Sequence, residues 1–155
     1  MQINGKFLIV KFNYFATKGL NKSGMEQDIR WKQRFQNFDK AMTHLVAALT
    51  KKDLSDLEKA GVIQIYEFTF ELAWKTLTDF LEGKEVVVKY PRDTIKEAFK
   101  YELIEDGDLW IDMLDKRNLM AHTYDEATAA LAFKLIDEKY FNALKQVNVS
   151  FKKEL

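Results

Sequence analysis

The chain has 155 residues, 47% hydrophobic and 31% charged, a balance typical of a single globular domain rather than a disordered chain. The chain has 24 basic residues (Lys and Arg) and 24 acidic residues (Asp and Glu), so its net charge is zero. This balance argues against DNA binding through bulk positive charge, and any phosphate binding must be local. The absence of cysteine and the presence of only two histidines exclude disulfides, thiolate metal sites and a His-rich metal site within one chain.

Residues 1–24 differ in pattern from the domain that we predict over residues 25–155. Alternate positions of this segment are apolar, as in a β-strand: Leu8, Val10, Phe12 and Tyr14. The sequence KGLNKSG then predicts a turn or linker, and a lone strand has no pairing partner in this chain. We therefore interpret the segment as an extension, either a native strand or non-native sequence joined to a domain that starts at Met25.

The apolar runs of this sequence are short. None approaches the ~20 residues of a membrane span. Lys11 interrupts the first run, and no small-residue cleavage site follows it, so we predict no signal peptide. We expect a soluble, cytoplasmic protein that makes no contact with a membrane.

Over residues 26–50, the apolar positions are spaced by three and four, which predicts one amphipathic helix with a single buried face. These positions are Trp31, Phe35, Phe38, Met42, Leu45 and Leu49. His44 lies off this stripe and is predicted to be exposed. Asp53 is the predicted cap of a second helical region, which runs to about Leu81 and stops at Gly83.

The second half of that region is apolar on two faces. One stripe consists of Val62, Tyr66, Phe70, Ala73, Leu77 and Leu81, and the other of Ile65, Phe68 and Leu72. Such a helix is central, either within the core or shared between the core and a partner surface. Its polar ridge consists of Glu67, Glu71 and Lys75, with a favourable Glu71–Lys75 pair. We interpret the ridge as solvent-exposed; the alternative is a carboxylate site for a substrate or partner at Glu67 and Glu71.

Shorter helices are predicted to follow. Pro91 opens or precedes the first of them, in which Thr94 and Glu97 have capping-box spacing. Asp108 caps the next helix after the break at EDGD, and residues 123–126 have a second capping-box pattern that starts the last helix. The result is four or five helices with short links and no convincing sheet. We therefore predict an all-α fold, a four-helix up-and-down bundle.

The stretch DKRNLMAHTYDE, residues 115–126, places Arg117, His122 and Tyr124 at the predicted joint between two helices. Residues five apart on one continuous helix diverge by roughly 140°, whereas a helix break before Thr123 lets Arg117 and His122 converge. Arg117 can bind a phosphate in a bidentate way, the next helix N-terminus adds N–H groups, and His122 can transfer protons. The alternative is a helix-end cation beside a packing histidine.

Other motifs indicate no further catalytic site. Asp106-Gly-Asp108 has a spacing that can hold magnesium beside a nucleotide, but it lies at a glycine break, where we prefer a helix cap. The chain has no glycine-rich phosphate loop, no Cys nucleophile and no Ser in a nucleophile elbow. We therefore expect no metal and no cofactor. Trp31, Trp74 and Trp110 lie on apolar stripes and are predicted to be core residues.

Three segments resemble the nucleotidyltransferase substrate-binding protein family, which belongs to the HEPN superfamily of helical bundles. They are YEFTFELAWKTLTDFLE, PRDTIKEAFKYELIEDGDLWIDMLDKRN and AHTYDEATA, in that order. The resemblance runs from about Met25 to the C-terminal helix and implies a four-helix up-and-down bundle that forms a homodimer. It also implies a separate minimal nucleotidyltransferase partner, usually encoded by a neighbouring gene. This chain has no Gly-Ser followed by D-x-D, so it lacks the signature of such a catalytic subunit.

In related HEPN toxins of two-gene toxin–antitoxin modules, R-x4-6-H is the active site of a metal-independent ribonuclease. The resemblance therefore implies catalytic roles for Arg117, His122 and the polar residue Asn118. In some such pairs the nucleotidyltransferase silences the nuclease by adding AMP to the tyrosine of R-x4-H-x-Y, which matches Tyr124. RNA cleavage by the neighbouring 2′-hydroxyl needs a base, an acid and a cation, and a two-fold interface would supply two histidines.

Three functions stay open at this point: an RNA-cleaving toxin, a non-catalytic subunit that presents a substrate to the nucleotidyltransferase, and a purely structural dimer. Acidic residues shortly before the motif weaken the nuclease interpretation, because they would repel RNA unless they face away from Arg117. They are Glu102, Glu105, Asp106, Asp108, Asp112 and Asp115. The same residues can form a docking face for a basic partner.

Overall fold

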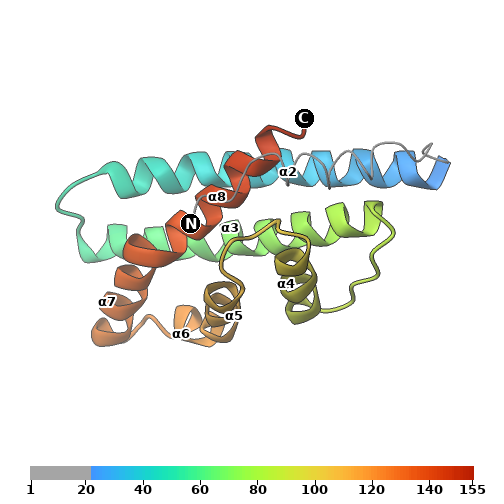
Figure 1. The fold of residues 1–155 in the computed structure, drawn as a ribbon. Helices are drawn as coiled ribbons and strands as arrows, with labels where there is room; N and C mark the ends of the chain where they lie inside the picture. Colours follow the sequence, from blue (N-terminus) through green and yellow to red (C-terminus); the bar gives the residue numbers. More distant parts are fainter. Residues whose placement is uncertain (1–21) are drawn as a thin grey trace, which may run out of the picture.

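The computed structural model describes residues 22–155, which form helices joined by loops, with no strand in this range (Figure 1). The elements in chain order are α2 (Lys22–Thr50), α3 (Asp56–Gly83), α4 (Pro91–Lys100), α5 (Gly107–Asp115), α6 (Arg117–Ala121), α7 (Glu126–Leu135), the π-helical turn η1 (Ile136–Tyr140) and α8 (Phe141–Lys152). The all-α fold predicted from the sequence is confirmed. The strand-like pattern of residues 8–14 lies outside the described residues, and α2 begins at Lys22, within the predicted linker.

Helix α3 is the centre of the bundle. It runs antiparallel to α2, and α4, α6, α7 and α8 all contact it (Figure 1). Helices α7 and α8 continue one another through η1, and this C-terminal rod crosses from α3 to α2. No helix within residues 22–155 combines the length and apolarity needed to cross a membrane.

The core consists largely of the stripes predicted from helical periodicity. On α2 the stripe is buried apart from the half-buried Leu49, and His44 is exposed as predicted. Every member of the first α3 stripe is buried: Val62, Tyr66, Phe70, Ala73, Leu77 and Leu81. The second stripe differs, since Ile65 and Leu72 are only half-buried and Phe68 is 41% exposed. The outer face of α3 is therefore left partly uncovered in a single chain.

A charged cluster fixes α2 against α3. The Asp79 carboxylate, only 5% exposed, lies 2.8 Å from Arg30 Nη2 and 2.6 Å from Arg34 Nε. Arg30 also pairs with Glu82 at the edge of the cluster. A buried carboxylate is costly unless it is paired, so these two arginines fix the register of the two long helices.

The helix caps differ from those predicted at four helices: α3, α4, α5 and α7. Ser55, not Asp53, caps α3, and its capping box with Glu58 is complete, whereas the backbone of Asp53 has φ 55°. A cap residue needs an extended backbone with its side chain turned back to the first turn, which Asp53 cannot provide. The predicted Thr94–Glu97 box in α4 is also wrong. Thr94 is buried, with its hydroxyl 2.9 Å from that of Thr78.

Asp106 caps α5, and the prediction of Asp108 was wrong. The Asp106 side chain accepts a hydrogen bond of 2.9 Å from the Leu109 N–H, while Asp108 lies in the first turn. We expect Asp106→Ala to lower the free energy of unfolding by about 1 kcal/mol, because an N–H at the start of α5 loses its acceptor. Urea unfolding of the matched variant Asp108→Ala is the control. An equal loss in both variants would contradict the assignment of the cap.

Candidate active site

The Arg-x4-His motif occupies the short helix α6. Arg117 is its first residue and His122 is its C-terminal cap residue, with φ −111° and ψ 38°. Helix α6 therefore runs from Arg117 up to His122, and the helix break that was predicted to let these two side chains converge does not lie between them. Helix α5 ends at Asp115, and the longer break comes after His122, in residues 122–125.

Helix α7 starts later than predicted. Asp125, rather than Thr123, is its cap, and the Asp125 carboxylate accepts hydrogen bonds from Thr128 N at 2.9 Å and Thr128 Oγ1 at 2.7 Å. Tyr124 consequently lies in the turn before the helix. The physical reason is that Asp125 has the extended backbone that a cap requires and offers a charged acceptor to the first-turn N–H.

The side chains of the motif are accessible to solvent. Arg117, Asn118 and His122 are exposed, and Tyr124 is 88% exposed. The rings of His122 and Tyr124 meet edge to face, with centroids 6.0 Å apart and an angle of 88°. A packing histidine would be buried, so the alternative interpretation of His122 as a core residue does not hold. The motif therefore offers an exposed cation, amide, imidazole and phenol along α6 and the turn after it, and the imidazole and the phenol are in contact.

The structure brings Glu71 of α3 to this motif. Its Oε2 atom lies 4.0 Å from Arg117 Nη1, and it also accepts a hydrogen bond of 2.9 Å from Trp74 Nε1. The predicted pair with Lys75 is confirmed at 2.9 Å. Burial acts to raise the pKa of Glu71, but Lys75, Trp74 and Arg117 outweigh it and the net pKa is lowered. Glu71 is therefore a charged carboxylate beside Arg117.

Glu67, one turn earlier on the same ridge, has a different environment. Partial burial raises the pKa of its carboxyl group. The two glutamates of the ridge are both half-buried, but only Glu71 faces the Arg-x4-His motif through an ion pair. The polar ridge of α3 is therefore not exposed to solvent along its whole length.

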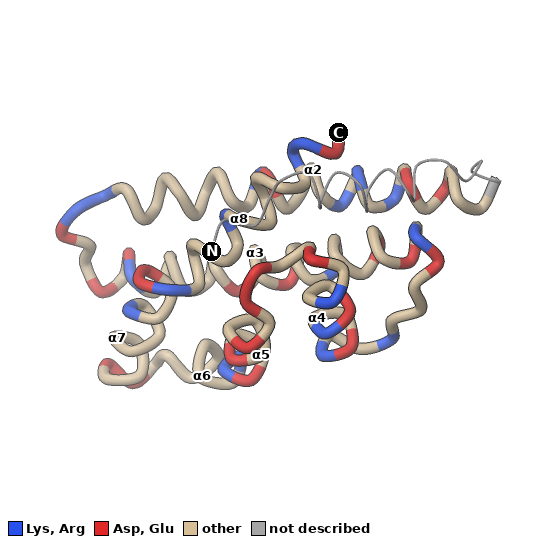
Figure 2. Tube along the Cα trace, viewed as in Figure 1, with Lys and Arg blue, Asp and Glu red and all other residues tan. Residues whose placement is uncertain are grey.

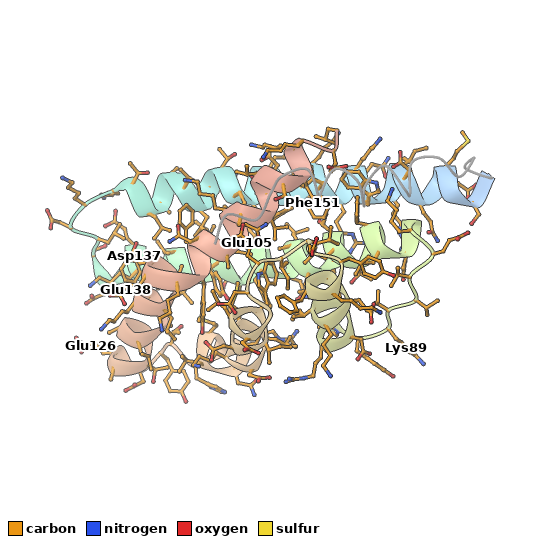
Figure 3. All side chains as sticks on the ribbon, viewed as in Figure 1. Lys89, Glu105, Glu126, Asp137, Glu138 and Phe151 are labelled. Carbon is orange, nitrogen blue, oxygen red and sulfur yellow. The ribbon has the colours of Figure 1, made fainter. Side chains whose placement is uncertain are left out.

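The acidic residues that precede the motif lie along α5 and in the loop before it (Figure 2), and half of them have structural roles. Asp106 caps α5, Asp112 bonds to Lys116 and to Tyr140, and Asp115 pairs with Arg92 of α4. Their negative charge is partly offset by these partners. The remaining acidic side chains, among them Glu105 in the loop before α5 (Figure 3), are exposed. Within residues 22–155, no three His, Asp or Glu side chains are grouped so as to hold a metal ion.

Sequence reasoning missed Lys116 and Arg92 as neighbours of the motif. Lys116 follows Asp112 by four positions, so the spacing of an ion pair on one helix was a usable signal. The Arg92–Asp115 pair joins residues 23 apart on two helices, and nothing in their local sequence indicates it.

Comparison with known proteins decides the family. The sequence profile of the family described as nucleotidyltransferase substrate binding protein like matches residues 33–153, most of the chain. The chain belongs to this family. The resemblance of the three sequence segments is thereby confirmed.

Relatives of this family member include a probable ribonuclease HepT of Haemophilus influenzae. The two are 32% identical over 84 residues, which is 51% of this chain and 58% of the relative, so the chain spans little more than half of that protein. A crystal structure of a Thermus thermophilus protein is similar at a TM-score of 0.68 and 31% identity, covering 74% of this chain and 98% of that one.

A solved structure from Haemophilus influenzae also supports the fold. It has been described as the fold of a substrate-binding domain of a nucleotidyltransferase. It is similar at a TM-score of 0.65 and 24% identity, covering 76% of this chain and 98% of the other. At this identity the likeness concerns the helical fold alone.

Proposed function

We propose that this family member is the RNA-cleaving toxin of a two-gene toxin–antitoxin module, controlled by a minimal nucleotidyltransferase encoded by a neighbouring gene. The observation that carries the proposal is the exposure of Arg117, Asn118, His122 and Tyr124 together on α6 and the turn after it. The similarity to a probable ribonuclease supports it.

The proposed reaction needs no group beyond RNA and protein side chains. The ribose 2′-oxygen attacks the adjacent phosphorus atom and gives its proton to a base, and the bond from phosphorus to the 5′-oxygen breaks. An acid protonates the leaving 5′-oxygen, which yields a 2′,3′-cyclic phosphate and a 5′-hydroxyl. Arg117 stabilises the charge on the phosphate, and Asn118 orients it by hydrogen bonds. His122 serves as base or acid, and the second histidine comes from the other copy in a homodimer.

The experiment that tests this function uses the purified chain and single-stranded RNA in the presence of a chelator. Cleavage that leaves cyclic phosphate ends is expected, together with slowed growth when the chain is expressed alone and restored growth when the nucleotidyltransferase is expressed with it. A chain that neither cleaves RNA nor slows growth would contradict the ribonuclease function.

A non-catalytic subunit that presents a substrate to the nucleotidyltransferase is the second candidate. Acidic residues gather around α5 (Figure 2). The exposed ones among them favour this candidate, because they offer a docking face to a basic partner. In that case the chain would bind the nucleotidyltransferase without RNA cleavage, and charge reversal of Glu105 and Asp108 would weaken the complex.

Tyr124 is the proposed site of silencing by AMP. Its side chain is 88% exposed, so the hydroxyl can attack the α-phosphate of ATP and displace pyrophosphate. After incubation with the nucleotidyltransferase and ATP, the intact mass is expected to rise by one AMP, and RNA cleavage is expected to stop. Tyr124→Phe should remain unmodified, whereas the control Tyr90→Phe, at a tyrosine that is 59% exposed on another helix end, should still gain AMP. An increment that persists in Tyr124→Phe would exclude this site.

A further inference from the structure

The C-terminal rod contains a π-helical turn, η1, between two α-helical segments. Its buried residues recur at steps of four: Ala132, Ile136, Tyr140 and Leu144. In a regular α-helix each such step rotates the side chain by about 40°, so the fourth residue would point away from the core. A π-turn is wound more loosely, which keeps these residues on one side. The π-turn therefore aims Tyr140 into the bundle.

Tyr140 is fully buried and makes one strong polar contact. Its hydroxyl donates a hydrogen bond of 2.5 Å to Asp112 Oδ2 in α5, 28 residues earlier in the chain. Its ring stacks on Tyr66 of α3, with centroids 5.7 Å apart and an angle of 22°. The neighbouring η1 residues Asp137 and Glu138 are exposed (Figure 3). Tyr140 thus links the rod to α3 by packing and to α5 by a charged hydrogen bond.

Asp112 also contacts Lys116, the residue before Arg117. Its Oδ1 atom pairs with Lys116 Nζ, and its carbonyl accepts a hydrogen bond of 2.9 Å from the Lys116 N–H. Burial acts to raise the pKa of Asp112, but the bonds from Lys116 and Tyr140 outweigh it and lower the net pKa. Asp112 is thus a carboxylate shared between a buried hydroxyl and the α5–α6 junction.

We propose that Tyr140 is a positioning residue for the Arg-x4-His motif, acting through Asp112 on the α5–α6 junction that carries Arg117. This inference rests on the proposed ribonuclease function only for its catalytic consequence. Residue Lys116 is held on one side by Asp112, while Asp115 is held by Arg92 of α4. Loss of the Tyr140 hydroxyl leaves both pairs in place but removes the bond that fixes the Asp112 carboxylate, and with it Lys116, to the rod. Helix α6 then keeps its place on the bundle but loses its defined orientation.

The test compares Tyr140→Phe with Tyr66→Phe. The two side chains are both buried and stacked on each other, but the Tyr66 hydroxyl has no hydrogen-bond partner within the described residues, so its removal is a matched control. In Tyr140→Phe, hydrogen exchange of the backbone amides of residues 116–122 is expected to speed up several-fold. The rate of RNA cleavage at saturating RNA should fall by about 10- to 100-fold, with unchanged affinity for RNA. Tyr66→Phe should change neither quantity.

The two readouts separate this inference from the ribonuclease function. Exchange that is unchanged in Tyr140→Phe, or cleavage that stays at the wild-type rate despite faster exchange, would overturn the positioning role. Faster exchange in a chain whose wild type does not cleave RNA would uphold the link to the junction and refute the ribonuclease function. If Tyr140→Phe fails to fold, Asp112→Asn, which keeps an acceptor but removes the charge that holds Lys116, takes its place with the same expected results.

Discussion

Alanine at Arg117 or at His122 is expected to lower the rate of RNA cleavage by at least ~100-fold, because each change removes either the cation at the phosphate or a proton-transferring group. Both side chains are exposed, and the contact of Arg117 with Glu71 is a long surface pair of 4.0 Å. Surface ion pairs of this kind contribute little to stability, so the free energy of unfolding should stay within about 0.5 kcal/mol of the wild type.

The measurement is single-turnover cleavage of a labelled RNA, together with urea unfolding of each variant. His44→Ala is the control for His122→Ala, since His44 is the other histidine and is exposed on α2. Arg117→Lys keeps the charge without the bidentate geometry and should retain partial activity. Cleavage by both alanine variants at the wild-type rate would show that the motif is not the active site.

Trp110→Ala is expected to lower the free energy of unfolding by about 3–5 kcal/mol, the usual loss when a large core aromatic is removed. Trp110 is 1% exposed in α5, and its ring centroid lies 5.9 Å from that of Phe70 in α3. Truncation leaves a cavity between the central helix and the segment that leads into Arg117. Each kcal/mol lost should lower the melting temperature by roughly 2–4 °C.

Thermal and urea unfolding measure this loss, and Trp74→Ala is the matched comparison. Trp74 is only half-buried on α3, and its indole N–H bonds to Glu71 at the edge of the bundle. A clearly smaller loss is expected there. Equal losses at the two positions would mean that α5 contributes no more to the core than the outer face of α3 does.

The helices of this bundle could be predicted because their apolar residues repeat at steps of three and four. That pattern alone located the buried faces of α2 and α3, and Pro91 marked the start of α4. The caps were harder to predict, because each start offers two or more Ser, Thr or Asp residues. Only the backbone conformation selects among them, as Asp106 over Asp108 shows.

The candidate site could be predicted only as far as its residues are close in sequence. Arg117, His122 and Tyr124 were identified from a short motif; the structure exposes all three and brings the rings of His122 and Tyr124 into contact. Glu71 and Tyr140 reach the same region from helices distant in sequence, so no local pattern indicates their contacts with Arg117 and Asp112. The sequence shows apolar residues at steps of four in the last helix, but the π-turn is evident only in the folded bundle.

On the outer face of α3, an uncovered apolar residue lies next to a glutamate that faces the Arg-x4-His motif. Phe68, 41% exposed, lies one helical turn from Glu71, and Glu71 faces Arg117. A protein that covers Phe68 therefore also comes close to Glu71 and, through Glu71, to Arg117. Under the proposed ribonuclease function, a partner bound at Phe68 would control access to the motif by its presence alone, without any change in the fold.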